Sequence, residues 1–326
     1  MRALRFERFG DLGELKLTEV ERPMPGTGEI LVAVRAASLN PSDVKNVNGK
    51  MEGTTLPRTP GRDFAGVVVA GSARLAGVEV WGACGEIGFT RDGSHAEFIV
   101  VPEDGVARKP ASLDFEEAAA GGVNFVTAWA GLVDATALGA GETVFVTGSA
   151  GGVGSSVVQL ARWMGARSIG IDRVDSAGLP PHLRPDVALT NPNDIAQAVA
   201  EQTQGRGVDV VFDTVGSPLF EQNLAALARG GRYVIISSAG DRRASFDILD
   251  FYHKRLVLHG VDTRAIGSAA AARILERLRP GFDRAALDAP FIAQRFSLED
   301  GLRAYQAVDA GLTGKVVLVM PGSSGA

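Results

Sequence analysis

A glycine-rich turn between a predicted strand and a predicted helix constrains this chain more than any other feature. Residues 143–147, Thr-Val-Phe-Val-Thr, form a β-branched and aromatic run typical of a buried parallel strand. The turn that follows, 148–154, contains four glycines in seven residues. Apolar residues then recur at helical spacing from Val153 to Met164. A strand, a turn that lets backbone approach a ligand closely and a helix N-terminus together predict a phosphate-binding unit.

The residues after this helix indicate which ligand the turn holds. Residues 168–171 predict a second strand, and Asp172 follows it. An acidic residue about 20 positions after the glycines is expected to bind the ribose hydroxyls of a dinucleotide. We therefore expect the pyrophosphate at Gly151, Gly152 and Val153, and the ribose at Asp172.

One position departs from the G-x-G-x-x-G pattern. Ser149 stands where the first glycine is expected, and a side chain there narrows the turn geometries that are allowed. The alternative is an ordinary strand-to-helix loop. Four glycines followed by an acid at the right distance favour the dinucleotide site.

The composition is that of a globular protein with about two domains. The chain has 326 residues, of which 45% are hydrophobic, enough for two cores. A net charge of −5 without a basic run argues against nucleic acid or an anionic membrane as partner. Charged residues within 1–8 and the lack of an 18-residue apolar run predict neither signal peptide nor membrane span, so we expect a cytoplasmic protein.

Metal-ligating residues are scarce. Cys84 is the only cysteine, which excludes an intramolecular disulfide and a cysteine cage for zinc. The four histidines are dispersed, which is typical of surface or packing positions: His95, His182, His253 and His259.

The patterns of secondary structure change twice along the chain. Residues 1–115 carry short extended segments broken by glycine and proline, typical of antiparallel β-structure. Residues 116–261 alternate helices and strands, which predicts an α/β doubly wound parallel sheet. We expect helices there at 116–133, 194–203 and 218–229, and strands at 208–213, 232–238 and 256–260. Residues 262–326 add helices at 269–278 and 298–310 and a strand at 315–320.

Several predicted strands end in residues suited to a ligand site. Ligands of an open parallel sheet bind outside the carboxyl ends of its strands. We therefore expect residues at four strand ends to line one crevice: Thr147 and Gly148, Asp172 and Arg173, Thr214, Val215 and Gly216, and Ser237 and Ser238. Generic turn chemistry is the alternative for any one of them.

Four motifs and the closing segment resemble one known superfamily. They are Asn-Pro-Ser-Asp at 40–43, Pro-Gly-Arg-Asp-Phe-Ala-Gly at 60–66, Asn-Phe-Val-Thr-Ala at 124–128, the turn at 148–154 and Gly-Lys-Val-Val-Leu at 314–318. This order resembles the medium-chain dehydrogenases/reductases, in particular their zinc-independent quinone oxidoreductase branch. The resemblance covers essentially the whole chain.

The resemblance implies two domains with an active site in the cleft between them. A β-rich GroES-like catalytic domain would comprise residues 1–115 and 262–326, and a Rossmann domain residues 116–261. The nicotinamide would lie near Asn40 and Thr127, with Val261 and Lys315 also at the cofactor. Family habit also implies a homodimer through the Rossmann sheet edge at 256–260.

The resemblance also implies chemistry without a metal. In the zinc-dependent relatives a cysteine stands at the position of Asn40, and a His-Glu pair at the positions of Arg62 and Asp63. Neither ligand position is kept, so hydrogen-bond donors must replace zinc in polarising a carbonyl. Asn40 and Thr127 are the candidate catalytic donors, although Asn40 and Asp43 are also suited to capping the helix after them.

The acceptor expected from this reading is a quinone or an activated alkene such as an enone. Related enoyl thioester reductases place a proton-donating tyrosine soon after the Asn-Pro-Ser-Asp motif, where this chain has Asn-Gly-Lys-Met at 48–51. An enoyl acid or enoyl thioester reductase is therefore the second interpretation. A nucleotide-binding sensor without catalysis is the third.

The choice between NADPH and NADH depends on two neighbouring residues. Asp172 would repel a 2′-phosphate if it faced the ribose. Arg173 would bind that phosphate, and the segment 172–175 resembles the Asp-Arg-Pro-Asp turn of NADPH-dependent enoyl reductases. We predict NADPH, on the condition that Asp172 pairs locally.

Overall fold

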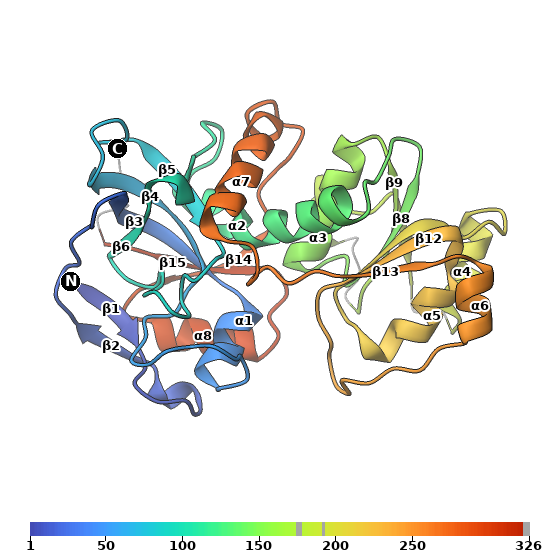
Figure 1. The fold of residues 1–326 in the computed structure, drawn as a ribbon, viewed down its shortest axis with the longest axis horizontal. Helices are drawn as coiled ribbons and strands as arrows, with labels where there is room; N and C mark the ends of the chain where they lie inside the picture. Colours follow the sequence, from blue (N-terminus) through green and yellow to red (C-terminus); the bar gives the residue numbers. More distant parts are fainter. Residues whose placement is uncertain (174–177, 191–192, 322–326) are drawn as a thin grey trace. The chain divides into compact units, whose positions relative to one another are not determined.

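The computed structural model describes residues 1–173, 178–190 and 193–321 (Figure 1). Its Cα positions divide the chain into two compact units. Unit 1 comprises Met1–Val126, Thr263–Ala285 and Ala289–Ala326, and unit 2 comprises Thr127–Asp262 and Ala286–Asp288. The chain passes from unit 1 to unit 2 between Val126 and Thr127, within helix α2 (Phe115–Trp129). The boundaries predicted from the sequence, after residues 115 and 261, remain a prediction.

Unit 2 is built on six parallel strands in the order β10-β9-β8-β11-β12-β13. In this order the direction of sheet growth reverses between β8 and β11, which is the switch point where doubly wound sheets bind dinucleotides. The strands are β8 (Thr143–Thr147), β9 (Arg167–Ile171), β10 (Val187–Leu189), β11 (Val208–Asp213), β12 (Leu227–Ile235) and β13 (Val257–Gly260).

Alternate residues of these strands pack into two apolar layers, one on each face of the sheet. Phe145, Val211 and Tyr233 are buried in one cluster with side chains of α4 and α5. On the opposite face a Cβ added at Gly131 would lie 2.3 Å from the ring of Phe212, so the helix there packs with its backbone against the sheet. The helices are η3 (Ala130–Ala135, a π-helix), α3 (Gly152–Trp163), α4 (Ile195–Gln202), α5 (Phe220–Ala225) and α6 (Ile248–His253).

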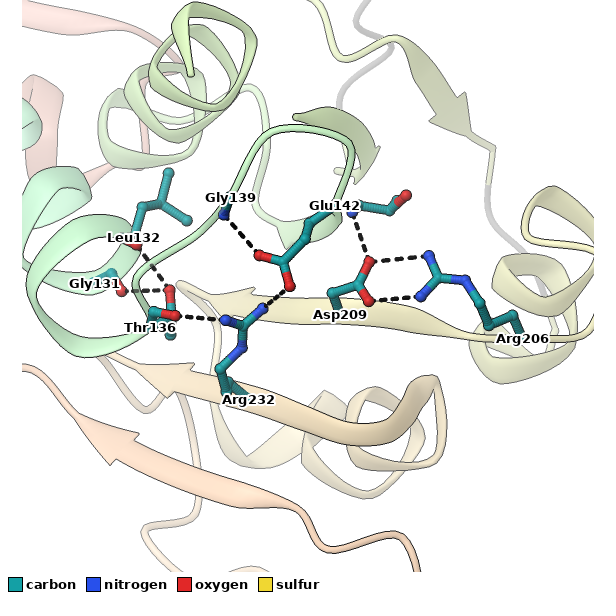
Figure 2. Close-up of polar contacts among 9 residues, drawn as sticks. Gly131, Leu132, Thr136, Gly139, Glu142, Arg206, Asp209 and Arg232 are labelled. Carbon is teal, nitrogen blue, oxygen red and sulfur yellow. Dashed lines mark hydrogen bonds and ion pairs between the residues drawn. The ribbon is translucent and has the colours of Figure 1, made fainter. Parts of the chain in front are cut away.

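A polar network links the amino ends of β8 and β11 and also holds Arg232 of β12 (Figure 2). Arg232 donates to the carbonyl of Thr136 at 2.6 Å and to the carboxylate of Glu142 at 2.5 Å. Asp209 accepts the backbone N–H of Thr143 at 2.8 Å. These contacts hold the strand register from the amino ends, and they leave the carboxyl ends available for a ligand.

Unit 1 contains a seven-stranded sheet and a two-stranded one. The main order is β14-β15-β3-β4-β5-β7, with β6 also paired to β3, and only β14 and β15 run parallel. The strands are β1 (Arg2–Arg5), β2 (Lys16–Glu19), β3 (Glu29–Leu39), β4 (Asp63–Ala70), β5 (Glu79–Ala83), β6 (Phe98–Pro102), β7 (Ala107–Arg108), β14 (Ile292–Ser297) and β15 (Lys315–Val319). The helices are α1 (Pro41–Val47), α2, α7 (Ser268–Asp283) and α8 (Gly301–Asp309).

The fold class is confirmed, and most predicted elements occur where expected. The predicted helix 218–229 is wrong at its second half, because α5 ends at Ala225 and Leu227 already pairs with Val208 in the sheet. Burial decides this, since Leu227 is needed as a sheet residue of the core around Val211. The sequence reading also missed β10, β14 and α6.

Candidate functional site

The glycine-rich turn follows β8 at the carboxyl edge of the parallel sheet. Gly148 has φ of +69°, and a Cβ there would lie 2.2 Å from the hydroxyl of Thr214. Ser149 is not among the residues with positive φ, so the departure from the glycine pattern falls where a side chain is tolerated. A Cβ on Gly154 would lie 2.1 Å from the carbonyl oxygen of Gly148. Glycine is therefore required at position 154, where the first turn of α3 packs closely on the glycine-rich turn.

Helix α3 presents its N-terminus at this turn. Gly151 is the N-cap, and the first intrahelical hydrogen bond runs from the N–H of Ser155 to the carbonyl of Gly151 at 2.9 Å. The N–H groups of the three residues between them therefore have no partner within the helix. A Cβ on Gly151 would meet only the carbonyl oxygen of Gly148, at 3.3 Å. This arrangement suits an anion.

Asp172 lies just after β9 and pairs with the turn. Its carboxylate accepts the backbone N–H of Ala150 at 2.9 Å. The next residue, Arg173, is exposed. Residues 174 and 175 of the Asp-Arg-Val-Asp segment lie outside the described residues.

Asp213 organises the carboxyl end of β11. One carboxylate oxygen accepts the backbone N–H groups of Val215 and Gly216, at 2.8 and 2.9 Å, and the hydroxyl of Thr147. The other oxygen accepts the hydroxyl of Tyr233 at 2.6 Å. Asp213 is fully buried. A single carboxylate thus fixes the shape of the loop that follows β11 and ties it to β8 and β12.

The structure brings four of the predicted residues together beside Asp213. Gly216 has φ of +88°, and a Cβ there would lie 2.4 Å from the carbonyl oxygen of Ser237. The hydroxyl of Ser238 lies 3.4 Å from the N–H of Ser217, and Ala239 donates to the carbonyl of Val215 at 2.7 Å. The loops after β11 and β12 therefore form one surface at the carboxyl edge.

Val261 and Thr127 are also part of unit 2. Val261 follows β13 and donates its N–H to the carbonyl of Ile235 at 2.9 Å, so it lies at the same carboxyl edge. Thr127 is a buried residue of α2. Asn40 and Lys315 belong to unit 1.

Asn40 and Lys315 meet in a buried polar cluster of unit 1. The ammonium of Lys315 donates to the side-chain oxygen of Asn40 at 2.8 Å and to the carbonyl of Leu39 at 3.1 Å. The amide nitrogen of Asn40 donates to Asp63 at 2.7 Å. Asn40 is also the N-cap of α1, and its backbone N–H donates to the carboxylate of Asp43 at 2.8 Å. The expected capping role is confirmed, and the Asn40 side chain has a second role in this cluster.

Asp63 accepts from three parts of the chain. Its oxygens bind the hydroxyl of Ser38 at 2.9 Å, the amide of Asn40 and the backbone N–H of Val123 at 2.6 Å. A Cβ on Gly122 would lie 2.4 Å from the same carboxylate, so glycine is required for this approach. The carboxylate anchors α2 to β3 and β4.

Burial dominates the electrostatics of this cluster. It raises the pKa of Asp43 to about 6, against the backbone N–H of Asn40 and the charge of Arg62. It lowers the pKa of Lys315, while Asp63 and Asp43 favour the charged ammonium. The polar cluster therefore holds one acid, Asp43, and one base, Lys315, with perturbed pKa values, which is common at functional sites.

His95 packs in the same region as a neutral ring. Nδ1 lies 2.8 Å from the hydroxyl of Tyr305 and Nε2 3.2 Å from the carbonyl of Ser38. Burial lowers the pKa of His95 to about 4 and raises that of Tyr305. The expectation of a packing histidine is confirmed for this residue. Cys84 is likewise buried, as expected of a small apolar side chain.

The part of the chain that the structure describes has neither a metal-ligand cluster nor a membrane-spanning helix. It contains no group of three or more His, Cys, Asp and Glu side chains that could hold a metal ion. No helix among the same residues is both long enough and apolar enough to span a bilayer. The cytoplasmic location stays a prediction.

Two organising residues were missed by reasoning from the sequence. The apolar pattern predicts Asp213 only as the end of a strand, although an acid that closes a run such as Val-Val-Phe is a signal of a buried hydrogen-bond acceptor. The resemblance to the superfamily identifies Asp63 only by its place at a zinc-ligand position of the zinc-dependent relatives. Its partners are far apart in the sequence, and no local pattern announces them.

Comparison with known proteins agrees with this architecture. Residues 26–111 match the alcohol dehydrogenase GroES-like domain, and residues 152–278 match the zinc-binding dehydrogenase domain. A zinc-type alcohol dehydrogenase-like protein of Schizosaccharomyces pombe is 35% identical over 287 residues, which cover 87% of this chain and 84% of that protein.

Two further relatives cover nearly the whole chain. The quinone oxidoreductase of Lama guanicoe is 30% identical over 336 residues, 98% of each chain. A mycobacterial protein solved in complex with NADPH has a TM-score of 0.86 at 28% identity, over 98% of this chain and 100% of its own. The chain therefore belongs to the medium-chain dehydrogenase/reductase superfamily of oxidoreductases, in its quinone oxidoreductase-like branch.

Proposed function

We propose that this enzyme uses NADPH to reduce a quinone or an enone by hydride transfer, without zinc. Quinone oxidoreductases of this superfamily use nicotinamide cofactors. The observation that carries the choice of NADPH is the hydrogen bond from Ala150 to Asp172, because it turns that carboxylate to the turn and leaves the exposed Arg173 to bind a 2′-phosphate.

The residues at the carboxyl edge of unit 2 fit a dinucleotide. The N-terminus of α3 offers N–H groups and a positive helix end for the pyrophosphate at Gly151, Gly152 and Val153. The surface formed by Val215, Gly216, Ser237 and Ser238 is the proposed site for the remainder of the cofactor, with Val261 beside it. A bound nicotinamide dinucleotide would supply the hydride.

The remaining chemistry is assigned to side chains. Reduction of a carbonyl-conjugated acceptor places negative charge on its oxygen, and preorganised donors lower the energy of that state. Asn40 gives one N–H to Asp63 and keeps a second for the acceptor. Lys315 fixes the orientation of the Asn40 side-chain amide, because its ammonium donates to the amide oxygen and the N–H groups must then lie at the other end. Thr127 is proposed as the second donor, and water supplies the proton.

Consumption of NADPH against three acceptor classes tests this function. We expect turnover with 1,4-naphthoquinone or with an enone, little with a crotonyl thioester, and no loss after exhaustive chelation. Turnover confined to the thioester would favour an enoyl reductase. Tight NADPH binding without oxidation by any acceptor would favour a nucleotide sensor, and activity that chelation removes and Zn²⁺ restores would contradict the metal-free proposal.

A further inference from the structure

Arg62 is a buried arginine whose donors are only partly used. It immediately precedes β4 and is 3% exposed. Its Nη1 donates to the hydroxyl of Thr263 at 3.3 Å, whereas Nε and Nη2 are buried without a hydrogen-bond partner among the residues that the structure describes. Buried donors in proteins are nearly always paired, and an unpaired donor on a charged group is especially costly. Two unpaired donors on one guanidinium therefore indicate a function.

The two unpaired nitrogens lie on the same edge of the guanidinium. Nε–H and the adjacent Nη2–H point in nearly parallel directions, so both can reach one oxygen or one oxygen pair. The face of the group is covered instead, since the Phe89 ring centroid lies 5.4 Å from Cζ. The free edge is thus the part of Arg62 that is suited to a ligand.

The neighbouring carboxylates do not take this edge. Asp63 accepts from Ser38, Asn40 and Val123, and Asp43 accepts from the backbone of Asn40. Asp43 interacts with Arg62 through charge, and among the described residues neither carboxylate is hydrogen-bonded to Nε or Nη2. The guanidinium is held in place by the burial and by Thr263, with its edge uncommitted.

We propose that this edge of Arg62 binds the acceptor's carbonyl oxygen and stabilises the negative charge that develops there. This inference rests on the proposed function. The hydride adds its electron pair to a conjugated carbon of the acceptor, and the π electrons move onto the carbonyl oxygen. Arg62 stabilises the resulting enolate oxygen, and a proton from water completes the enol, which tautomerises to the hydroquinone when the acceptor is a quinone. The reductant is NADPH, which leaves oxidised.

Arg62 acts in this step only as a donor. A guanidinium keeps its proton at all accessible pH values, so it stabilises charge without giving up hydrogen. Its burial excludes water and strengthens the interaction. Because Nε and Nη2 are buried in this structure, the acceptor can contact them only after a local rearrangement.

Kinetics of two variants test the proposal. With 1,4-naphthoquinone and saturating NADPH, we expect Arg62→Gln to lower kcat about 10²- to 10³-fold and to leave the NADPH dissociation constant unchanged. Arg62→Lys keeps the positive charge but lacks the paired Nε–H and Nη2–H donors. We expect its kcat to lie between those of the parent and Arg62→Gln. Arg303→Gln is the matched control, because Arg303 also lies over a phenylalanine, Phe296 at 5.9 Å, but is exposed and paired with Asp300. We expect it to behave as the parent.

The split between kcat and KM separates this role from others. A rise in KM at unchanged kcat would mean that Arg62 only anchors the acceptor's ground state, and that would overturn the proposal. A kcat within threefold of the parent would overturn it as well.

A binding experiment decides the matter without turnover. 4-Nitrophenolate carries an oxyanion and absorbs in the visible range, so a titration of the protein-bound probe reports stabilisation of its charge. We expect the parent to lower the probe's pKa by about one unit and Arg62→Gln to leave it unchanged. Equal probe titrations in both would overturn the role of Arg62 even if the enzyme reduces quinones. A difference between them would support it even if the correct acceptor is another carbonyl compound.

Discussion

The carboxylate of Asp172 accepts the backbone N–H of Ala150 at 2.9 Å, which ties the end of β9 to the glycine-rich turn. An acid in this geometry reinforces the phosphate-binding turn, and the exposed Arg173 follows it directly. The consequence is that the preference between the two nicotinamide dinucleotides is expected to depend on Arg173.

Substitution of Arg173 by alanine tests this preference. A charge-assisted contact to the 2′-phosphate is worth roughly 1.5 to 3 kcal/mol, so we expect kcat/KM for NADPH to fall about 10- to 100-fold. The value for NADH should stay nearly the same. Arg167→Ala is a suitable control, since Arg167 begins the same strand and donates to the carbonyl of Gln202. Equal losses with both cofactors would show that Arg173 does not read the phosphate.

Gly152 offers a second test, aimed at the pyrophosphate. It is the first residue of α3, directly after the N-cap. A valine there would occupy the space that the phosphates need, so we expect Gly152→Val to abolish dinucleotide binding while the protein stays folded. Calorimetric titration with NADPH and circular dichroism measure the two effects. Gly139→Val is the control, because a Cβ on Gly139 meets only Glu142, at 3.6 Å. Unchanged affinity in Gly152→Val would place the phosphates elsewhere.

Asp213 predicts a coupled loss of stability and cofactor affinity. Replacement by alanine leaves the N–H groups of Val215 and Gly216 without their buried acceptor. Each unsatisfied N–H group lowers the stability of the fold by about 1 to 3 kcal/mol. We expect Asp213→Ala to lower the thermal midpoint and to weaken NADPH binding. Thr147→Val removes one donor to the same carboxylate and should have the smaller effect. An alanine variant with full affinity would show that the loop keeps its shape without Asp213.

Unit 2 could be predicted from the sequence because its signals are local. The strands Thr143–Thr147 and Val208–Asp213 are confirmed to the residue, since each is a continuous apolar run closed by a turn. The helix limits failed at Leu227, where pairing with β11 overrides the helical pattern. Local patterns cannot report such a tertiary preference.

The polar cluster of unit 1 could be predicted only as a set of motif positions. Ser38, Asn40, Asp63 and Val123 meet through one carboxylate, although up to 85 residues separate them. Their contacts arise from the pairing of β3 with β4 and from the path of α2. The resemblance to a family pointed to Asn40 and Lys315, but the bond between them required the structure.

His95 predicts a pH dependence of stability. Burial lowers its pKa from 6.5 to about 4, so the neutral ring stabilises the fold above pH 6.5 and this contribution is lost as the pH falls through 4. Its neighbours are Tyr305, the carbonyl of Ser38 and the charge of Lys315. We expect the free energy of unfolding to fall by about 3 kcal/mol more in the parent than in His95→Gln between pH 7 and pH 4. Urea titrations at each pH measure it.

Asp43 serves as a control of opposite sign for this experiment. Burial raises its pKa to about 6, so its contribution is present below pH 3.8 and is lost as the pH rises through 6. Asp43→Asn should therefore remove a loss of stability on raising the pH, whereas His95→Gln removes one on lowering it. Parallel pH profiles for His95→Gln and the parent would contradict the assigned shift.

The edge strand β13 predicts a homodimer. It is the last strand of the parallel sheet, and Val257 and Leu258 on it are 44% and 37% exposed. An open apolar edge favours pairing with a second copy. Light scattering at micromolar concentration should give twice 34.0 kDa for the parent and the single mass for Val257→Lys. Val69→Lys, at an equally exposed apolar position in β4, should leave the dimer intact. A monomer mass for the parent would remove this prediction.

Asp63 accepts hydrogen bonds from three donors, and this arrangement affects how readily a member of this branch could acquire the zinc ligands of its zinc-dependent relatives. Asn40→Cys together with Arg62→His would rebuild two of the three ligand positions. The first change, however, removes a donor to Asp63 and the one side-chain acceptor that Lys315 has among the described residues. The ammonium would then be buried with less compensation, at a cost in stability. A chain that gained the metal ligands one substitution at a time would first have a less stable fold. Single substitutions therefore do not readily convert a member of this branch into a zinc-dependent one.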